Sequence, residues 1–578
     1  MSTLKRLTTA SLVAGLMVVG ACESLNVADP NDPDRGRVLS DAASVTTLAA
    51  GALKSWFNTT MAMDPDGALT TMADNYTASW NNFQMRLYSS EPRASWQNDP
   101  AATARVEIEA YWYGYYAALS SANDVLASIR TRGLFAGEPD SAMVLSLALL
   151  LQGLAVGELA LNYDQGFVVD YNTDLGTLTL STRLQMRDFA LAKFDTAIAV
   201  ATANTFTWPD PNPALSWTGG AGCGGGEPRA HASPPCTNVE VAKIANTMAA
   251  RLIAYFPRAS SEAQTAADWD RVVGYASKGI SSGAPFDFGF TGDGCVKFCD
   301  ELRLWADDIT TMRMDTRVAN MLDPATQTTP WPDPAGNPQP NSADRRLGDG
   351  TYDASASLCT DGYTVCPATA NAGTDYAYSP LAIFRPTRGQ YHQSNVGQIR
   401  YDYVGFSAPD GSGGGFGFSP VVLSAENDLL WAEGLIRGTA PNLATAATLI
   451  NNTRVTRGGL APAAAGDGAP LLLTRLRYEQ DVELPGDAAA PYYNRRRIDG
   501  LQAQTPHQMP IPAKELGVLG LAYYTFGGTY PGFSPPVGSP SGDGNAGRAF
   551  DVTHLMREAR TIWQHMFEDR MAMIRAIR

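Results

Sequence analysis

The spacing of apolar residues between positions 421 and 462 predicts two short helices joined by a turn. Ser424 and Asn442 are candidate N-caps for the two helices, which end near Gly438 and Gly458. A hairpin of this length corresponds to one tetratricopeptide-type unit, and such a unit buries its apolar face only by stacking against further hairpins. Apolar side chains recur three or four residues apart in both halves, at Ala425, Leu429, Ala432 and Ile436 and then at Leu443, Ala446, Ala447 and Ile450.

Charged residues on the first helix of this hairpin fit an exposed surface. Glu433 and Arg437 lie four residues apart, in the order that favours an ion pair on a solvated helix face. We therefore expect Glu433 and Arg437 to stabilise the scaffold rather than to bind a ligand.

Similar periodicity predicts further helices on both sides of this hairpin. The clearest runs from 104 to 130, and its aromatic residues are expected in the core. At 237–240, Thr-Asn-Val-Glu forms a capping box that opens another helix. Further candidates cover residues 39–61, 68–76, 184–201, 263–280 and 551–577, the last with Leu555, Ala559, Ile562 and Met566 on one face.

Residues 141–161 form an apolar stretch that is long enough to span a membrane. Gln152 and Glu158 lie within the stretch, and basic flanks are missing. The pattern therefore predicts a helix buried at the centre of the helical stack, where Gly153 and Gly157 allow close contact with neighbouring helices.

Regular periodicity disappears between residues 281 and 419, where Gly, Pro, Asp, Asn and aromatic residues dominate. A loop of this length without structure is unusual inside a compact domain, so we expect a folded insertion of loops and short strands. The predicted fold is mainly α, with about four tetratricopeptide-like helical pairs in one domain over 37–578. The helical scaffold covers 37–280 and 420–517, and a C-terminal extension covers 518–578.

The N-terminus has the pattern of an export signal. A positive start with Lys5 and Arg6 precedes a short apolar stretch, which ends in Val-Gly-Ala-Cys at 19–22. This pattern resembles a bacterial lipobox with Cys22 as the lipidated residue; the alternative is an ordinary signal peptide followed by a chance cysteine. Residues 22–36 are expected to form a polar tether. Their acidic residues could bind calcium, but the spacing is not that of an EF-hand.

Six further cysteines form three pairs of sequence neighbours within predicted loops. Export to an oxidising compartment favours disulfide bonds between the members of each pair, with zinc binding as the alternative. The pairs are Cys223 with Cys236, Cys295 with Cys299, and Cys359 with Cys366.

The net charge of −15 and the lack of any basic run exclude nucleic acid as an expected partner. Motifs of serine hydrolases, zinc proteases, kinases and P-loop proteins do not occur in the sequence. Pairs of acidic residues such as Asp307 and Asp308 could serve glycoside hydrolysis, but with 58 acidic residues such pairs arise by chance. We expect a protein that is not an enzyme and uses no cofactor or metal.

Aromatic residues in predicted loops are the best candidates for ligand contact. Flat rings flanked by Asn, Asp and Arg suit sugars, whose C–H faces pack on the ring while their hydroxyl groups form hydrogen bonds. The alternative is that these rings form the core of the insertion. The candidates are Trp80, Trp96, Trp305, Trp331, Tyr391, Tyr401, Tyr403 and Phe416.

Several segments together resemble the SusD/RagB family of outer-membrane nutrient-binding lipoproteins. The strongest matches are AENDLLWAEGLIRG at 425–438, AATLINNTRVTRGGL at 446–460 and MPIPAKEL at 509–516, in the order typical of the family. NYTASW at 75–80 and YWYGYYAALSSANDVLASI at 111–129 precede them. The segment RYEQDVELPGD matches only loosely, and the chain continues well beyond residue 516.

The resemblance implies a helical, non-catalytic lipoprotein at the cell surface, anchored in the outer membrane through Cys22. It implies capture of an oligosaccharide or another nutrient, and delivery to a TonB-dependent, SusC-like transporter barrel. Two alternatives stay open from the residues alone: a secreted helical-repeat adaptor that binds peptides or proteins, and a surface glycosidase.

Overall fold

The computed structural model describes residues 35–77, 82–90, 92–138, 140–208, 221–224, 234–296, 298–306, 312–329, 340, 342–347, 373–378, 392–394, 396–398, 400 and 416–528. Cys22, residues 23–34 of the predicted tether and the predicted C-terminal helix lie outside these residues, while residues 35 and 36 already belong to a short helix. So do Cys359 and Cys366, and the side chain of Phe416.

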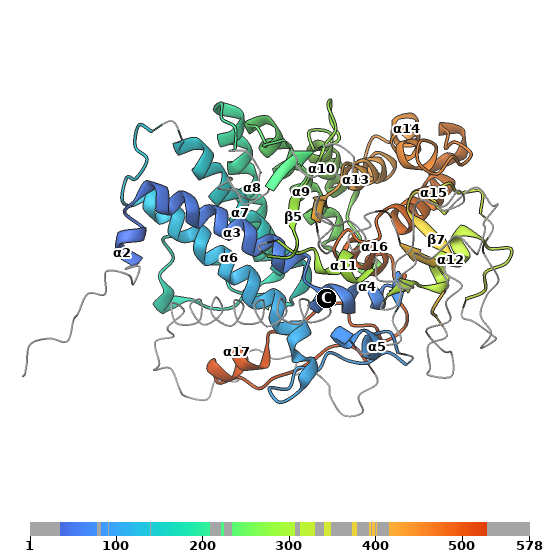
Figure 1. The fold of residues 1–578 in the computed structure, drawn as a ribbon, viewed down its shortest axis with the longest axis horizontal. Helices are drawn as coiled ribbons and strands as arrows, with labels where there is room; N and C mark the ends of the chain where they lie inside the picture. Colours follow the sequence, from blue (N-terminus) through green and yellow to red (C-terminus); the bar gives the residue numbers. More distant parts are fainter. Residues whose placement is uncertain are drawn as a thin grey trace, which may run out of the picture.

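The described residues form a helical scaffold of paired helices, as the sequence predicts (Figure 1). Four pairs pack along the chain: α3 (Ala42–Thr60) with α6 (Val106–Arg130), α7 (Ser141–Asn162) with α8 (Arg183–Ala203), α9 (Asn238–Tyr255) with α10 (Ala266–Ala276), and α13 (Ser424–Arg437) with α14 (Leu443–Arg454). Helix α10 also packs against α13 and joins the two parts of the scaffold.

Further helices outside the four pairs and outside the insertion complete the scaffold. The remaining helices are α2 (Arg35–Val38), α4 (Met63–Met72), α5 (Met85–Tyr88), α15 (Gly468–Glu483), α16 (Ala490–Arg496) and α17 (Ala513–Val518). Single 3₁₀ turns lie at Asn82–Gln84, Thr103–Arg105, Leu175–Thr177, Ser260–Glu262 and Ala465–Asp467.

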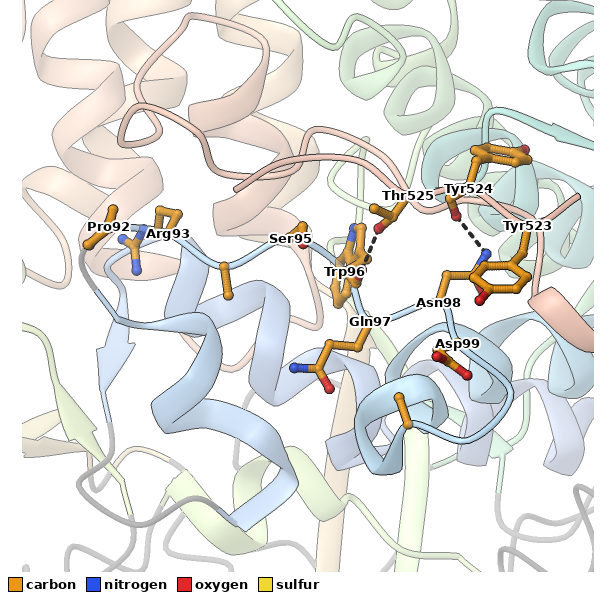
Figure 2. A pocket seen from close by; sticks show the side chains of 12 residues that line it. Pro92, Arg93, Ser95, Trp96, Gln97, Asn98, Asp99, Tyr523, Tyr524 and Thr525 are labelled. Carbon is orange, nitrogen blue, oxygen red and sulfur yellow. Dashed lines mark hydrogen bonds between the residues drawn. The ribbon is translucent and has the colours of Figure 1, made fainter. Parts of the chain in front are cut away.

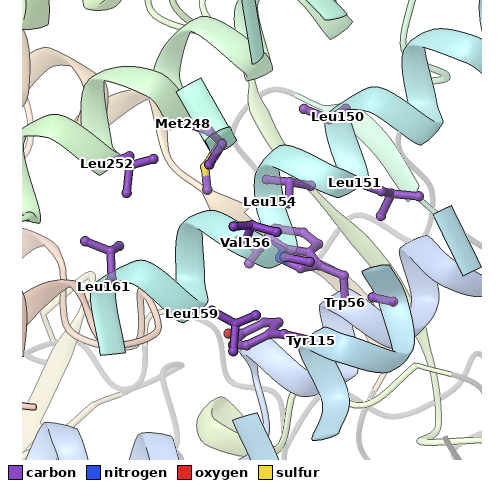
Figure 3. Close-up of a cluster of buried hydrophobic side chains, with 14 of the residues drawn as sticks. Trp56, Tyr115, Leu150, Leu151, Leu154, Val156, Leu159, Leu161, Met248 and Leu252 are labelled. Carbon is purple, nitrogen blue, oxygen red and sulfur yellow. The ribbon is translucent and has the colours of Figure 1, made fainter. Parts of the chain in front are cut away.

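Helix α7 is the centre of the main hydrophobic core. It is the one helix of the described residues with the length and composition of a membrane span, and 94% of its most apolar window is buried in the protein. Leu154 and Leu159 pack among side chains from α3, α6 and α9, including Trp56, Tyr115 and Met248 (Figure 3). The prediction of a buried helix rather than a membrane span is confirmed.

Gly153 shows why the centre of α7 requires a small residue. A Cβ atom at this position would lie 2.5 Å from the ring of Phe194 on α8, which is closer than atoms can approach. Gly157 faces α8 and α9 less tightly, because its nearest neighbour would be a methyl carbon of Leu252 at 3.5 Å. Close helix contact at Gly153 is therefore as expected from the sequence.

Replacing Leu154 with alanine is expected to lower the free energy of unfolding by about 2–5 kcal/mol, because the cavity cannot collapse inside this packed layer. Leu184→Ala is the matched control, since Leu184 on α8 is 47% exposed; its loss is expected to stay below about 0.5 kcal/mol. Urea unfolding followed by circular dichroism measures both changes. Equal losses in the two variants would contradict the central role of α7.

Strands are few and short in the described residues, and most belong to the predicted insertion. A three-stranded antiparallel sheet has the order β4-β5-β9, with Cys223 paired to Phe288 and Phe290 paired to Ser419. The strands are β1 (Tyr76–Thr77), β2 (Gln165–Gly166), β3 (Ser181–Thr182), β4 (Ala221–Gly224), β5 (Asp287–Asp293), β6 (Arg313–Met314), β7 (Tyr376–Tyr378), β8 (Val396–Gln398) and β9 (Phe416–Val422). The insertion also contains two helices, α11 (Glu301–Ala306) and α12 (Thr316–Leu322).

Two of the three predicted disulfide bonds lie in the described residues, and both are present. Cys223 on β4 is bonded to Cys236 just before α9, and Cys295 is bonded to Cys299 between β5 and α11. The pairing of sequence neighbours is thus confirmed for these four cysteines.

The predicted cap of helix α13 is wrong in one respect. Ser424 is the first helical residue, and its N–H and hydroxyl groups both donate to Oδ1 of Asp287 on β5, at 2.7 and 2.8 Å. The free N–H group at the helix start is thus satisfied from a distant strand. Asn442 does cap α14, because its side chain accepts from the N–H of Thr445. The capping contact between Glu240 and the N–H of Thr237 is also present, at 2.6 Å.

The prediction of an exposed Glu433–Arg437 pair is wrong as well. The Glu433 side chain is 2% exposed, and it accepts from Arg437 at 2.8 Å. Arg497, which follows α16, packs against the same carboxylate and donates to it at 2.8 and 2.5 Å. Tertiary packing buries Glu433 and adds a second arginine, while the Arg437 side chain stays 29% exposed.

Buried ion pairs attach the irregular insertion to helix α15. Arg346 contacts Asp344 at 2.8 Å, Glu479 at 2.9 Å and Glu483 at 3.0 Å, and all four side chains are fully buried. Arg457 extends this cluster, since it contacts Glu483 at 2.6 Å. Glu479 and Glu483 lie one helical turn apart, so α15 presents both to the insertion.

Candidate functional site

A groove of about 590 Å³ lies where residues 92–99 run beside the chain that follows α17. These two segments are more than 400 positions apart in the sequence, and neither belongs to a long helix. The lining residues are Pro92, Arg93, Ala94, Ser95, Trp96, Gln97, Asn98, Asp99, Ala102, Tyr523, Tyr524 and Thr525.

Hydrogen bonds join the two walls of the groove directly (Figure 2). The N–H of Trp96 donates to the carbonyl of Phe526 at 3.1 Å, and Thr525 donates its hydroxyl group back to the carbonyl of Trp96. The Asn98 amide donates to the carbonyls of Tyr524 at 2.8 Å and Ile511 at 2.9 Å. The bonds to Phe526, Thr525 and Tyr524 cross between the walls and hold them together, while the bond to Ile511 ties Asn98 to the segment before α17.

Asn98 also fixes the position of the closing motif MPIPAKEL. Its side-chain oxygen accepts from the N–H of Ala513, the first residue of α17, at 2.8 Å. The side chain is thus bonded on both its oxygen and its nitrogen, and the residue is only 5% exposed. Asn98 is therefore a structural residue that supports the groove rather than a group free to bind a ligand.

Arg93 anchors the other end of the same wall. Its guanidinium donates to the carbonyl of Tyr88 at 3.0 Å and forms a buried ion pair with Asp74. Asp74 also contacts Arg495 on α16 at 2.7 Å. Burial opposes the ionisation of Asp74, but the two arginines outweigh it and hold its pKa below the ordinary value. The Arg93 guanidinium is thus paired with Asp74 and the Tyr88 carbonyl, so its charge is neutralised within the protein.

The two described tryptophans among the predicted ligand contacts are packed in the interior. Trp96 is 1% exposed, its ring lies 4.8 Å from that of Tyr88, and its ring N–H donates to the carbonyl of Gln508 at 2.9 Å. Trp305 is 7% exposed and packs against Phe83 in a second hydrophobic core. Neither ring has a face open to solvent. Both therefore follow the alternative interpretation, in which these aromatic residues form part of the protein core. Trp80, Trp331, Tyr391, Tyr401 and Tyr403 lie outside the described residues.

The groove instead exposes a ring that was not among the predicted contacts. Tyr523 is 46% exposed, and its ring points from the second wall toward the end of the first wall that carries Asp99 (Figure 2). Gln97 and Asp99, which line the groove on the opposite wall, are exposed as well. The tryptophans were chosen as aromatic residues in predicted loops. Tyr523 lies in the irregular stretch after residue 516, so the same criterion applied there includes it.

Tyr524 holds the second wall in place. Its hydroxyl group contacts the carboxylate of Asp164, just beyond α7, at 2.7 and 2.9 Å. Burial raises the pKa of both the tyrosine and the aspartate. The exposed Tyr523 is therefore followed by a fixed residue, because Tyr524 is bonded through its hydroxyl group to Asp164 and through its carbonyl to Asn98.

The groove thus combines one open aromatic ring with amide and carboxylate groups. Asp99 is the one carboxylate among its described lining residues. The described lining therefore suits the binding of a ligand with both apolar and hydrogen-bonding faces.

Comparison with known proteins gives structural similarity alone. No family model matches the chain, and no curated protein matches it. A SusD superfamily protein from Bacteroides vulgatus has 12% identity and a TM-score of 0.49, over 83% of this chain and 97% of its own. A SusD/RagB family protein from Bacteroides thetaiotaomicron has 12% identity and a TM-score of 0.48, over 80% and 90%.

A third similar structure is surface glycan-binding protein A from Bacteroides uniformis. It has 15% identity and a TM-score of 0.45, over 79% of this chain and 90% of its own. These three solved structures are described as a SusD superfamily protein, a SusD/RagB family protein and a surface glycan-binding protein.

Proposed function

We propose that this chain is a SusD/RagB-type lipoprotein of the outer membrane that captures an oligosaccharide in the groove beside Tyr523. The observation that carries the proposal is the groove itself. An exposed aromatic ring, Gln97 and Asp99 line a space of about 590 Å³, the size of a small-molecule site. A sugar ring could pack its C–H face on Tyr523 while its hydroxyl groups bind the amide and the carboxylate.

The order of the sequence motifs supports the family assignment and the proposed location. The lipobox that ends at Cys22 would attach the protein to the membrane, and residues 23–36 would form a tether. In this proposal the bound sugar passes to a TonB-dependent, SusC-like barrel. Co-purification of a large outer-membrane barrel with the native protein tests that partner, and its loss in the Cys22→Ser variant would tie the partnership to membrane attachment.

Tyr523→Ala is expected to weaken oligosaccharide binding by at least about tenfold, because the stacking surface is lost. Tyr523→Phe keeps the ring and should retain most of the affinity. A solved structure with 12% identity to this chain contains xylogluco-oligosaccharide, which makes that sugar a practical first probe within a panel of glycans. Isothermal titration calorimetry on the purified chain gives the dissociation constants.

Tyr275→Ala is the control for this measurement. Tyr275 is a partly exposed tyrosine on α10 and does not line the groove, so its loss should leave sugar affinity unchanged. Equal affinities for Tyr523→Ala and the parent protein would remove the groove from the proposal. Binding of peptides in the same panel, with no binding of glycans, would favour the helical-repeat adaptor instead.

A further inference from the structure

A continuous apolar surface follows helix α17. Eight large apolar side chains are exposed in the described residues, and three of them lie within six positions. Val518 is 63% exposed, Leu521 is 40% exposed and Tyr523 is 46% exposed. Residues 517–523 read Gly-Val-Leu-Gly-Leu-Ala-Tyr, so this stretch has no polar side chain apart from the tyrosine hydroxyl. We call it the 517–523 patch.

The exposure of the patch follows from a fixed turn. Leu521 donates its N–H to the carbonyl of Leu516 at 2.8 Å, and Gly520 takes the left-handed conformation with φ of +70°. This arrangement is a common way to end a helix. Leu516 is buried and Leu519 packs against the main core, so these two side chains anchor the inner side of the turn. Val518 and Leu521 are therefore held facing outward by the geometry of the backbone.

An exposed patch of this kind marks a surface that another segment covers. The chain itself supplies a suitable segment, because residues 551–577 have the apolar periodicity of an amphipathic helix. Its stripe of Leu555, Ala559, Ile562 and Met566 also needs an apolar surface to pack against. The 517–523 patch and the apolar stripe of residues 551–577 thus each need an apolar partner surface.

The connection between them is long enough. The 22 residues 529–550 follow directly after Gly528 and, fully extended, reach roughly 70 Å. Gly528 itself is fixed beside the groove, since its N–H donates to the carbonyl of Gln504 at 2.8 Å. Because both segments belong to one chain, their effective concentration is on the order of millimolar, far above that of a second copy in dilute solution.

We propose that residues 551–577 dock through their apolar stripe on the 517–523 patch of the same chain. This inference does not depend on the nature of the ligand, because it concerns Val518 and Leu521, which do not line the groove. Tyr523 belongs to both surfaces, so the docked segment would lie at the edge of the groove.

The test places a photo-crosslinking amino acid at position 518 in the full-length chain. Mass spectrometry should find crosslinks to peptides from residues 551–577 within a single chain, with a yield that does not change on tenfold dilution. The same probe at Val239, which is 57% exposed on α9, should give no crosslink to these peptides. Ile562→Asp should reduce the crosslink yield from position 518 at least about tenfold, while circular dichroism shows the fold unchanged.

Three results would overturn the proposal. One is a crosslink only between two chains, lost on dilution, which would make the occupant a second copy. Another is a crosslink only to a different segment or to a co-purified barrel protein. The third is a yield that Ile562→Asp leaves intact, because the stripe would then not be the docking face. Failure of sugar binding has no bearing on any of these results.

Discussion

Replacing Arg346 with methionine is expected to lower the free energy of unfolding by about 3–5 kcal/mol, because it leaves buried carboxylates without their counter-charge. Asp344, Glu479 and Glu483 all contact this arginine within 3.0 Å. Burial alone would lower the pKa of Arg346, but the carboxylates overcome it and raise the pKa well above its ordinary value. The variant would also release the insertion locally, since Arg346 connects it to α15. Urea unfolding and limited proteolysis measure the two effects.

Arg35→Met is the control for this prediction. Arg35 contacts Asp124 at 2.5 Å, but its side chain is 64% exposed, so the loss should stay below about 1 kcal/mol. Adding Glu479→Gln to Arg346→Met should recover part of the lost stability, because one unpaired charge is then removed. The prediction would be contradicted by equal losses in the Arg346 and Arg35 variants.

The second large effect is a loss of stability in acid that depends on Glu433. Burial opposes ionisation of this carboxylate, but Arg497 and then Arg437 outweigh it and lower the pKa from 4.5 to about 2. The folded pKa lies below the unfolded one, so this contribution to stability is complete above about pH 4.5 and disappears as the pH falls toward 2. A shift of this size corresponds to about 3 kcal/mol.

Glu433→Gln should flatten the acid limb of the stability curve by this amount. It should also cost stability at pH 7, because Arg497 stays buried without a carboxylate. Unfolding by urea at pH 7, 4.5, 3 and 2.5, in both proteins, gives the difference. Identical slopes between pH 4.5 and 2.5 would show that Glu433 is not the titrating group.

Other buried acids give stability the opposite dependence on pH. The contribution of Glu433 is therefore the difference between the unfolding free energies of the variant and the parent protein at each pH. Burial raises the pKa of Glu301 to about 7 and that of Asp315 to about 6. Their folded pKa values lie above the unfolded ones, so stability falls as the pH rises from about 4 toward 7. Glu483 has the same pH dependence as Glu433, because Arg400, Arg457 and Arg346 lower its pKa to about 2 despite burial.

Local signals in the sequence correctly predicted much of the scaffold. Periodic apolar residues identified α6, α13 and α14, because an amphipathic helix buries one stripe of its surface. The polar residues within α7 and its missing basic flanks identified it as a core helix. Neighbouring cysteines paired as expected, since a short loop closes easily.

The candidate site was predicted less well, because it depends on contacts between distant segments. Trp96 was predicted to lie in a loop as a candidate ligand contact; it lies beside the groove, but its ring turns inward against Tyr88. The open ring belongs to Tyr523, which reaches the groove only because Asn98 and Thr525 join the two walls. Residues 92–99 and 523–525 show no sequence pattern from which their contact could be predicted.

The sequence by itself indicated the four helical pairs, the central place of α7, and the bonds Cys223–Cys236 and Cys295–Cys299, because periodicity and loop closure act over a few residues. It did not single out helix α15. The tertiary structure alone decided how these parts are used. It caps Ser424 with Asp287 from strand β5 and buries Glu433 between two arginines. It also assembles a groove from residues 92–99 and 523–525. Burial and ion pairing depend on which distant surfaces meet, and one chain's local pattern does not contain that information.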